Sequence, residues 1–236
     1  MWADMASRLI LVTGGARSGK SGYALERAEV LAGTSVETAA KTQAKDRVFI
    51  ATSPVTDPEM AERIARHQEE RRGRGWRLIE EETDLPAAIG RAELSSSTQA
   101  DPAWAAQSGL ADAEFSHAGF AHSGHGVILI DCLTLWINNL LYQAQTKGDL
   151  QGEPFADADM DEHCERLIAA CRQHDGAVLL VTNEVGMGIV PENTLARHYR
   201  DLIGRANRRL AAAADEVVFV CCGIPLTIKS DFHESA

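Results

Sequence analysis

Short, uninterrupted apolar runs alternate along the chain with longer segments in which apolar residues recur every three or four positions. The runs that predict strands are Leu9–Val12, Val48–Ala51, Val127–Ile130, Val178–Val181 and Val217–Val220. Helical spacing covers residues 57–72, 133–145, 157–173 and 192–213. Continuous apolar strands that alternate with helices are typical of a parallel sheet covered on both faces. The pattern therefore predicts an α/β fold with a doubly wound, mainly parallel sheet.

Two stretches interrupt this alternation. Residues 33–46 and 93–125 are rich in Ala, Ser, Gly, Thr and Gln and show little periodicity, so we expect exposed insertions there. The second stretch contains His117, His122 and His125, but no carboxylate or cysteine stands at a spacing that would complete a metal site, which favours a solvated loop. With 236 residues and 45% apolar content, the chain is expected to form one domain.

Composition restricts the class of partner and the compartment. The chain has 34 acidic and 23 basic residues, a formal charge of −11, so it is a poor general partner for nucleic acids or anionic membranes. The longest apolar stretch, residues 217–226, is about half of what a membrane span needs, and no signal peptide is evident. The five cysteines are odd in number and lack CxxC spacing, which favours reduced, mostly buried thiols. Together these features predict a soluble, cytoplasmic protein.

A glycine-rich motif follows the first apolar run and precedes a strong helix-forming segment. Its residues are Gly14, Gly15, Ala16, Arg17, Ser18, Gly19, Lys20 and Ser21, which match the phosphate-binding loop pattern of glycine, four residues, glycine, lysine and serine. The unpaired N–H groups and the dipole of the helix N-terminus favour an anion at this place. We predict that Lys20 contacts nucleotide phosphates and that the Ser21 hydroxyl is a Mg²⁺ ligand. A glycine-rich turn that meets the pattern by chance is the alternative.

Polar residues follow two other predicted strands. Asp131 comes directly after Val127–Ile130, where a carboxylate would hold Mg²⁺ beside the loop hydroxyl, although a cap on the next helix explains it too. The segment from Val181 to Gly188 carries polar residues and two glycines after another strand. We expect this segment to border the second substrate, while a turn stabilised by Asn183 and Glu184 explains the same residues.

The segment 57–72 carries a candidate nucleophile. Arg63, His67 and Arg71 are spaced four apart and share one face of the predicted helix. Neighbouring cations favour a neutral imidazole and attract phosphate oxygens, as a histidine that attacks a nucleotide α-phosphate would require. A solvated helix face is the alternative, and spacing alone leaves both interpretations open.

Taken together, several segments resemble the bifunctional adenosylcobinamide kinase/adenosylcobinamide-phosphate guanylyltransferases of cobalamin biosynthesis. These segments are "LVTGGARSGKS", "FIATS", "DPEMAERIARHQEER", "GWRLIEE", "LIDCLTLWINNLL", the block from "VTNEVGMGIVPEN" to "DEVVFV", and "GIPLTIK". The resemblance implies transfer of a phosphoryl group from ATP or GTP to adenosylcobinamide, and then transfer of GMP from GTP through a covalent GMP-histidine at His67. It also implies a P-loop NTPase fold of the RecA-like group and a homo-oligomer such as a trimer.

By the same residue-by-residue match, the resemblance implies a nucleotide site. Its members would be Gly14 to Ser21, Ala51, Thr52, Ser53, Gln68, Glu69, Glu70, Arg71, Glu80 and Asp131. We expect helix 57–72 to move on GTP binding and bring His67 within attack distance of the α-phosphate. Two other functions compete with this one: a kinase that has kept only the phosphoryl step, and a regulatory protein whose loop senses ATP or GTP.

Overall fold

The structure, a computed structural model, describes residues 7–33, 46–53, 62, 69, 71, 73–94, 126–147 and 155–231. Its strands are β1 (Arg8–Gly14), β2 (Arg47–Ala51), β3 (Arg77–Glu80), β4 (Val127–Asp131), β5 (Ala177–Val181), β6 (Glu216–Cys221) and β7 (Ile224–Ser230). They form one sheet in the order β3-β2-β4-β5-β1-β6-β7. All neighbouring strands are parallel except β7, which runs antiparallel to β6. The predicted α/β fold with a mainly parallel sheet is therefore confirmed.

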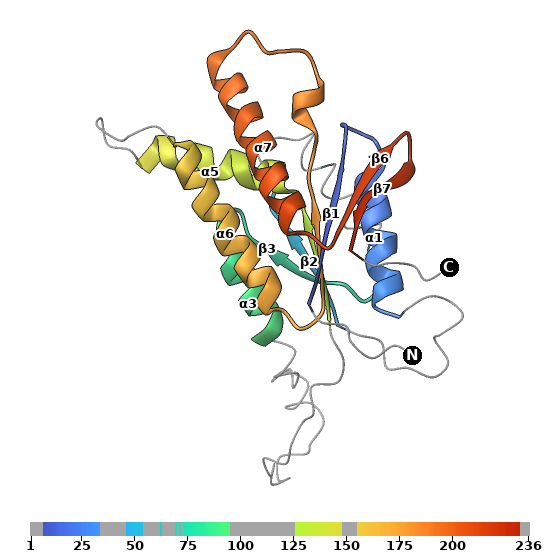
Figure 1. The fold of residues 1–236 in the computed structure, drawn as a ribbon. Helices are drawn as coiled ribbons and strands as arrows, with labels where there is room; N and C mark the ends of the chain where they lie inside the picture. Colours follow the sequence, from blue (N-terminus) through green and yellow to red (C-terminus); the bar gives the residue numbers. More distant parts are fainter. Residues whose placement is uncertain are drawn as a thin grey trace.

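Helices cover both faces of this sheet (Figure 1). They are α1 (Lys20–Leu31), α3 (Leu85–Leu94), α5 (Leu133–Lys147), α6 (Asp157–Gln173) and α7 (Thr194–Ala213), with a short 3-10 turn, η1 (Val185–Met187). Along β1, Leu9 and Leu11 join the core beneath α3, α5, α6 and α7, whereas Ile10 and Val12 join the core beneath α1. Because successive strand residues point to opposite faces, a strand buried on both sides needs apolar residues throughout.

The local pattern located most elements but missed some. All five predicted strands lie within observed ones, and α6 spans the predicted residues 157–173. Helix α7 begins at Thr194, rather than at residue 192, because the Asn193 side chain accepts a hydrogen bond from Ala196 N–H (3.1 Å) and caps the helix. The sequence pattern did not predict the strands β3 and β7 or the helix α3. Pro225 is tolerated inside β7 because that strand lies at the edge of the sheet.

Three other predictions need correction or stay open. Helix α3 reaches Leu94, so the predicted insertion at 93–125 does not begin at residue 93, and residues 34–45 and 95–125 lie outside the described part. All five cysteines are free, as predicted, but they are not mostly buried. Cys164 and Cys171 are buried in the core, whereas Cys221 and Cys222 are exposed because they lie at the end of β6. That the chain forms a single domain stays a prediction.

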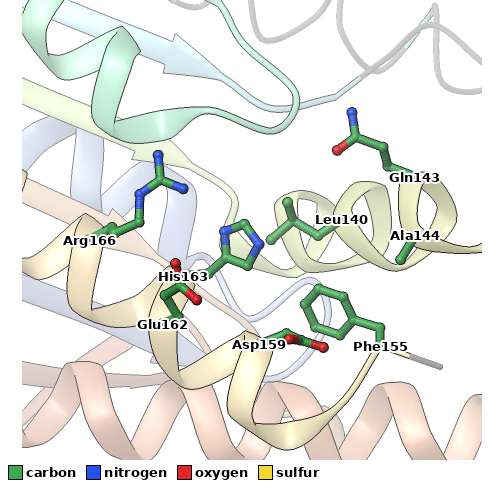
Figure 2. Close-up of a pocket in the computed structure, with 8 residues that line it drawn as sticks. All are labelled: Leu140, Gln143, Ala144, Phe155, Asp159, Glu162, His163 and Arg166. Atoms are coloured by element: carbon green, nitrogen blue, oxygen red, sulfur yellow. The ribbon is translucent and has the colours of Figure 1, made fainter. Parts of the chain in front are cut away.

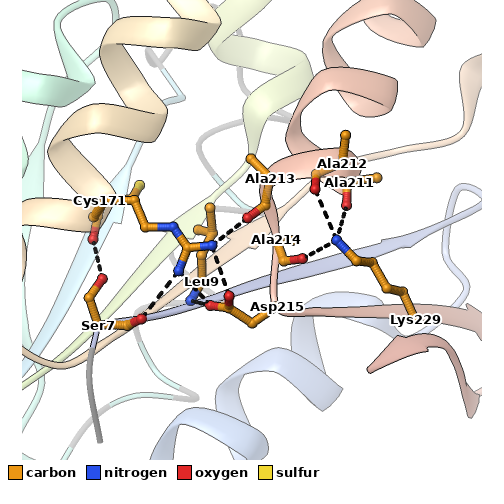
Figure 3. A network of polar contacts seen from close by, with 10 residues as sticks. Ser7, Leu9, Cys171, Ala211, Ala212, Ala213, Ala214, Asp215 and Lys229 are labelled. Atoms are coloured by element: carbon orange, nitrogen blue, oxygen red, sulfur yellow. Dashed lines mark hydrogen bonds and ion pairs between the residues drawn. The ribbon is translucent and has the colours of Figure 1, made fainter. Parts of the chain in front are cut away.

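Polar contacts fasten the helix ends at the amino edge of the sheet, where the parallel strands begin (Figure 3). Arg172, near the end of α6, donates to both carboxylate oxygens of Asp215 (2.7 and 2.8 Å) and to Ala213 O (2.5 Å). Asp215 also accepts a hydrogen bond from Leu9 N–H (2.7 Å). Lys229 of β7 donates to three backbone carbonyls at the end of α7. These bonds satisfy helix-end carbonyls that would otherwise lack partners.

The ionised form of Asp215 is favoured in this network. Burial alone would raise the pKa of the Asp215 carboxyl, but the hydrogen bonds from Arg172 and Leu9 and the charges of Arg172 and Lys229 hold that pKa below its usual value.

In the part of the chain that the structure describes, no helix is long and apolar enough to cross a membrane.

Candidate functional site

The glycine-rich loop joins β1 to α1 at the carboxyl edge of the sheet. A Cβ at Gly14 would lie 2.3 Å from Val220 O and 2.8 Å from Ser18 Oγ, so only glycine fits between β6 and the loop. Gly19 has a φ of 93° and precedes α1 without any side-chain capping hydrogen bond. Lys20 Nζ donates to Gly15 O (3.0 Å), which folds the lysine side chain over the loop. The first turn of α1 therefore meets a compact loop without a side-chain cap, as at helix ends that bind anions.

Within this loop, the Ser18 hydroxyl is buried. The residue is 8% exposed, and Ser18 Oγ has no hydrogen-bond partner among the described residues. A buried hydroxyl normally forms a hydrogen bond, so one without a partner indicates a position that a ligand or water completes. Ser21, in the first turn of α1, is half-buried.

The strand register places Asp131 in the same row as other predicted site residues. Ala51 of β2 pairs with Glu80 of β3 on one side and with Asp131 of β4 on the other. Asp131 pairs with Val181, which pairs with Val12 of β1. Because neighbouring strands are about 4.8 Å apart, Asp131 is about 10 Å from β1, whereas Glu80, four strands away, is about 19 Å from it. The structure thus brings Asp131 toward the loop and leaves Glu80 at the far side of the sheet.

Thr52 holds the chain at the carboxyl end of β4. Its buried Oγ1 donates to Cys132 O (2.8 Å) and accepts from Cys132 N–H (2.9 Å), directly after Asp131. Thr52 O in turn accepts a hydrogen bond from Asn139 Nδ2 of α5 (2.9 Å). The side chain of Thr52, predicted to line the nucleotide site, is therefore engaged within the protein, where it holds the end of β4. Ser53, which follows it, is half-buried.

The pKa of the Cys132 thiol reflects burial and the charges beside Asp131. Burial raises the pKa of this thiol, the negative charge of Asp131 raises it further, and the charge of Lys20 acts in the opposite direction. The charge of Lys20 is thus one of those that act on the thiol at the end of β4. Behind this point, Tyr199 of α7 donates to Thr134 O (2.9 Å), and burial raises the pKa of Tyr199 to about 12.

A buried polar cluster joins the segment after β5 to the glycine-rich loop. Glu184 Oε1 accepts hydrogen bonds from Thr13 Oγ1 (2.8 Å) and Asn207 Nδ2 (3.0 Å), and Glu184 N–H donates to Gly14 O (3.1 Å). Asn207 Oδ1 also accepts from Thr182 Oγ1 (2.7 Å). For Glu184, the structure supports the interpretation as a stabilised turn. Sequence reasoning missed Asn207 and Asn139, since nothing local marks a helix asparagine as a bridge to distant strands.

Only part of the predicted 57–72 segment is described. Glu62, Glu69 and Arg71 are helical, and the guanidinium carbon of Arg71 lies 3.7 Å from the centroid of the Phe49 ring of β2. Glu69 is exposed. Three predicted site residues, His67, Gln68 and Glu70, lie outside the described residues, and the roles proposed for them stay predictions.

A cavity of about 300 Å³ lies elsewhere, between α5 and the start of α6 (Figure 2). His163 stacks on Phe155 in its wall, with ring centroids 5.9 Å apart. Burial lowers the pKa of His163, and the charge of Arg166 lowers it further. None of the predicted site residues lines this cavity, so the cavity is separate from the candidate site. Among the described residues, no three histidine, cysteine or acidic side chains gather as a metal site.

The fold and the site define an α/β protein whose glycine-rich loop, strand-end carboxylate and buried polar supports meet at the carboxyl edge of a mainly parallel sheet. Comparison with protein families adds the next step. The family described as cobinamide kinase / cobinamide phosphate guanyltransferase matches residues 10–101 and 100–228, and the chain belongs to this family of enzymes. The family resemblance noted in the sequence is thereby confirmed.

Three relatives illustrate the match. The chain is similar to the bifunctional adenosylcobalamin biosynthesis protein CobU of Salmonella typhimurium, with 40% identity over 223 residues, 94% of this chain and 99% of the relative. It is 38% identical over 225 residues to the protein of the same name in Escherichia coli, covering 94% and 99% of the two chains. It is 32% identical over 221 residues to the bifunctional adenosylcobalamin biosynthesis protein CobP of Pseudomonas aeruginosa, covering 94% and 97%.

Proposed function

We propose that this enzyme phosphorylates adenosylcobinamide with ATP or GTP and then transfers GMP from GTP to that phosphate, which gives adenosylcobinamide-GDP. The family match over nearly the whole chain supports both activities. The single observation that carries the proposal is the glycine-rich loop between β1 and α1, with Lys20 folded over it and Asp131 in the strand row nearby. The same loop supports assignment to the P-loop NTPases, and the family match supports the RecA-like group within them.

In the kinase step, the loop would position the nucleotide. The backbone N–H groups of the loop and Lys20 would bind the phosphates, and Lys20 Nζ would exchange its bond to Gly15 O for phosphate oxygens. Phosphoryl transfer asks the protein mainly to align the acceptor hydroxyl and to stabilise charge on the transferred group. The loop is suited to this task because it carries positive charge and because the hydrogen bond from Glu184 N–H to Gly14 O holds its backbone in place.

The residues present fit a Mg²⁺ ion. Ser21 and Asp131 offer a hydroxyl and a carboxylate, the hard oxygen ligands that Mg²⁺ prefers, and Mg²⁺ commonly takes only one or two protein ligands besides phosphate and water. Ser21 and Asp131 are both half-buried, which limits competing solvent. When bound, Mg²⁺ would offset the negative charge on the nucleotide phosphates.

In the transferase step, His67 would act as the nucleophile. An imidazole nitrogen would attack the α-phosphorus of GTP, pyrophosphate would leave, and a phosphoramidate bond would join GMP to the histidine. A phosphate oxygen of adenosylcobinamide phosphate would then attack the same phosphorus and release the imidazole. Two displacements replace one difficult reaction, and the match of the "RIARH" segment to the family supports this assignment.

The test is a covalent labelling experiment with GTP labelled at the α-phosphate. Wild-type enzyme is expected to retain an acid-labile, base-stable label on a denaturing gel, and His67→Ala is expected to lose it. His163→Ala, in the separate cavity, serves as the matched control and should keep the label. If a folded wild type that binds GTP takes up no label, the covalent route is wrong and a kinase-only function is favoured.

We also propose that the enzyme assembles as a homo-oligomer, with a trimer as the expected size. Exposed apolar side chains support this: Ile189 is 96% exposed and Met187 74%, and Ile224 of the edge strand β7 is 69% exposed. Sedimentation equilibrium measures the mass directly. A monomer at all concentrations would contradict the proposal.

A further inference from the structure

Two adjacent cysteines occupy the hairpin between β6 and β7. Cys221 pairs with Ile224, so Cys222 and Gly223 form a two-residue turn, with φ values of 54° and 79°. Positive φ at both positions defines the type I′ turn, which normally takes Asn-Gly or Gly-Gly. Cysteine at the first position is therefore not explained by turn preference.

The two thiols face each other in solvent. Cys221 Sγ and Cys222 Sγ are 3.8 Å apart, and both residues are exposed. The hydrogen bond with Cys222 and the charge of its thiolate raise the pKa of Cys221. The other three cysteines differ, because Cys164 and Cys171 are buried and Cys132 is half-buried beside Asp131.

The same turn contacts the glycine-rich loop. Gly223 N–H donates to Ser18 O at 2.9 Å. A Cβ placed on Gly19 would lie 3.3 Å from Gly223 Cα, so the turn packs closely on the residue that precedes α1. A change in the backbone of the turn is therefore transmitted directly to the loop at Ser18 and Gly19.

We propose that Cys221 and Cys222 form a reversible oxidation site, at which a small disulfide oxidant closes a disulfide between them and displaces the glycine-rich loop. One thiolate attacks a sulfur of the oxidant, such as oxidised glutathione, and releases one reduced glutathione. The second cysteine then attacks the mixed disulfide and releases another. The two cysteines lose two protons and two electrons, which the oxidant gains as it becomes two molecules of reduced glutathione.

Ring closure is incompatible with the present turn. The sulfurs, now 3.8 Å apart, must approach to about 2.05 Å. Adjacent Cα atoms are only about 3.8 Å apart across a trans peptide, below the usual range for disulfides of about 4.4–6.8 Å. The backbone at Cys222 must therefore rearrange, and the Gly223 bond to Ser18 moves with it. A bond formed under such strain is also readily reduced, so the site is reversible.

The experiment treats the reduced full-length enzyme with oxidised glutathione and measures intact mass, peptide masses and hydrogen exchange. We expect a loss of two hydrogen atoms in mass, a disulfide within the 221–222 peptide, and faster exchange at the amides of residues 14–21. GTP is expected to bind several-fold more weakly to the oxidised enzyme. Reduction with dithiothreitol should restore both properties.

Two variants serve as controls. Cys222→Asn keeps a residue that favours the type I′ turn and removes one thiol, and Cys221→Ser leaves the turn residue in place. Neither should form the disulfide, and in both the exchange of the loop should be insensitive to the oxidant.

A stable glutathione adduct, a disulfide between chains, or an internal disulfide that leaves exchange of the loop unchanged would overturn the proposal. The effect on GTP rests on the proposed nucleotide site. A reduced enzyme that binds no GTP would contradict that function, while the mass and exchange data would still decide the oxidation site.

Discussion

The two edges of the sheet use their polar groups differently. At the amino edge, Arg172 and Lys229 each bond to several partners, including backbone carbonyls at the end of α7. At the carboxyl edge, Ser18 Oγ and Asn183 Oδ1 are buried without a hydrogen-bond partner in the described chain, and the loop uses glycine conformations that other residues avoid. The contacts of the amino edge thus stabilise the fold, whereas the buried side-chain oxygens that lack a hydrogen bond among the described residues lie at the carboxyl edge, where a ligand or water can complete them.

The largest effect should come from Lys20→Ala. Loss of the charge that faces the phosphates should reduce both kinase and guanylyltransferase turnover by a factor on the order of 10²–10³, because electrostatic stabilisation is removed at the transferring group. The Tm should change little. Steady-state assays with cobinamide and each nucleotide measure the turnover. The control is Lys229→Ala, at the amino edge, which should show the opposite result: lower stability with turnover retained. Normal turnover in Lys20→Ala would contradict the proposed site.

At the amino edge, Arg172→Ala should mainly destabilise the fold. The variant removes hydrogen bonds to Asp215 and to Ala213 O, and the arginine side chain is 37% exposed, so solvent screens part of the loss. We expect the free energy of unfolding to fall by about 2 kcal/mol, as measured by denaturant titration. Turnover per folded molecule should stay at the wild-type level, and a specific loss of activity would show that the two edges are not separate.

Acid should reduce the difference in the free energy of unfolding between the wild type and Arg172→Ala. The folded pKa of Asp215 lies below the usual value of 3.8, so its stabilising contribution is present above 3.8 and is lost as the pH falls through the lower folded pKa. Denaturant titrations near neutral pH and at several values below 3.8 test this. A difference that stays constant with pH would show that Asp215 ionisation does not carry the contribution of Arg172.

The smallest expected effect is that of Thr13→Val, which removes one hydrogen bond behind the glycine-rich loop. Valine keeps the shape but removes the hydrogen bond to Glu184, at a cost of about 1 kcal/mol in the free energy of unfolding. Because Glu184 also bonds Gly14 O, the loop should loosen and the KM for nucleotide should rise by a small factor. Thr146→Val, on the exposed end of α5, is the matched control. An unchanged KM would mean that Glu184 supports the fold without positioning the loop.

Sequence alone determined much of the frame. The apolar runs of β1, β2, β4, β5 and β6 predict strands because burial on both faces demands continuous apolar residues. The glycine-rich loop was found because its spacing is local and its residue types are constrained by backbone geometry. Asp131 was placed at a strand end for the same reason, and the family followed from motifs spread over the chain.

Only the tertiary structure decided which distant groups meet. The bonds of Thr52 to Cys132, of Asn207 to Glu184, and of Gly223 to Ser18 join residues whose separation in sequence gives no local signal. The order of the strands places Glu80 far from β1 while Asp131 is near, although each is the last residue of its strand. Periodicity reports which face of an element is buried, but the neighbours on that face depend on strand order and register, which long-range packing sets.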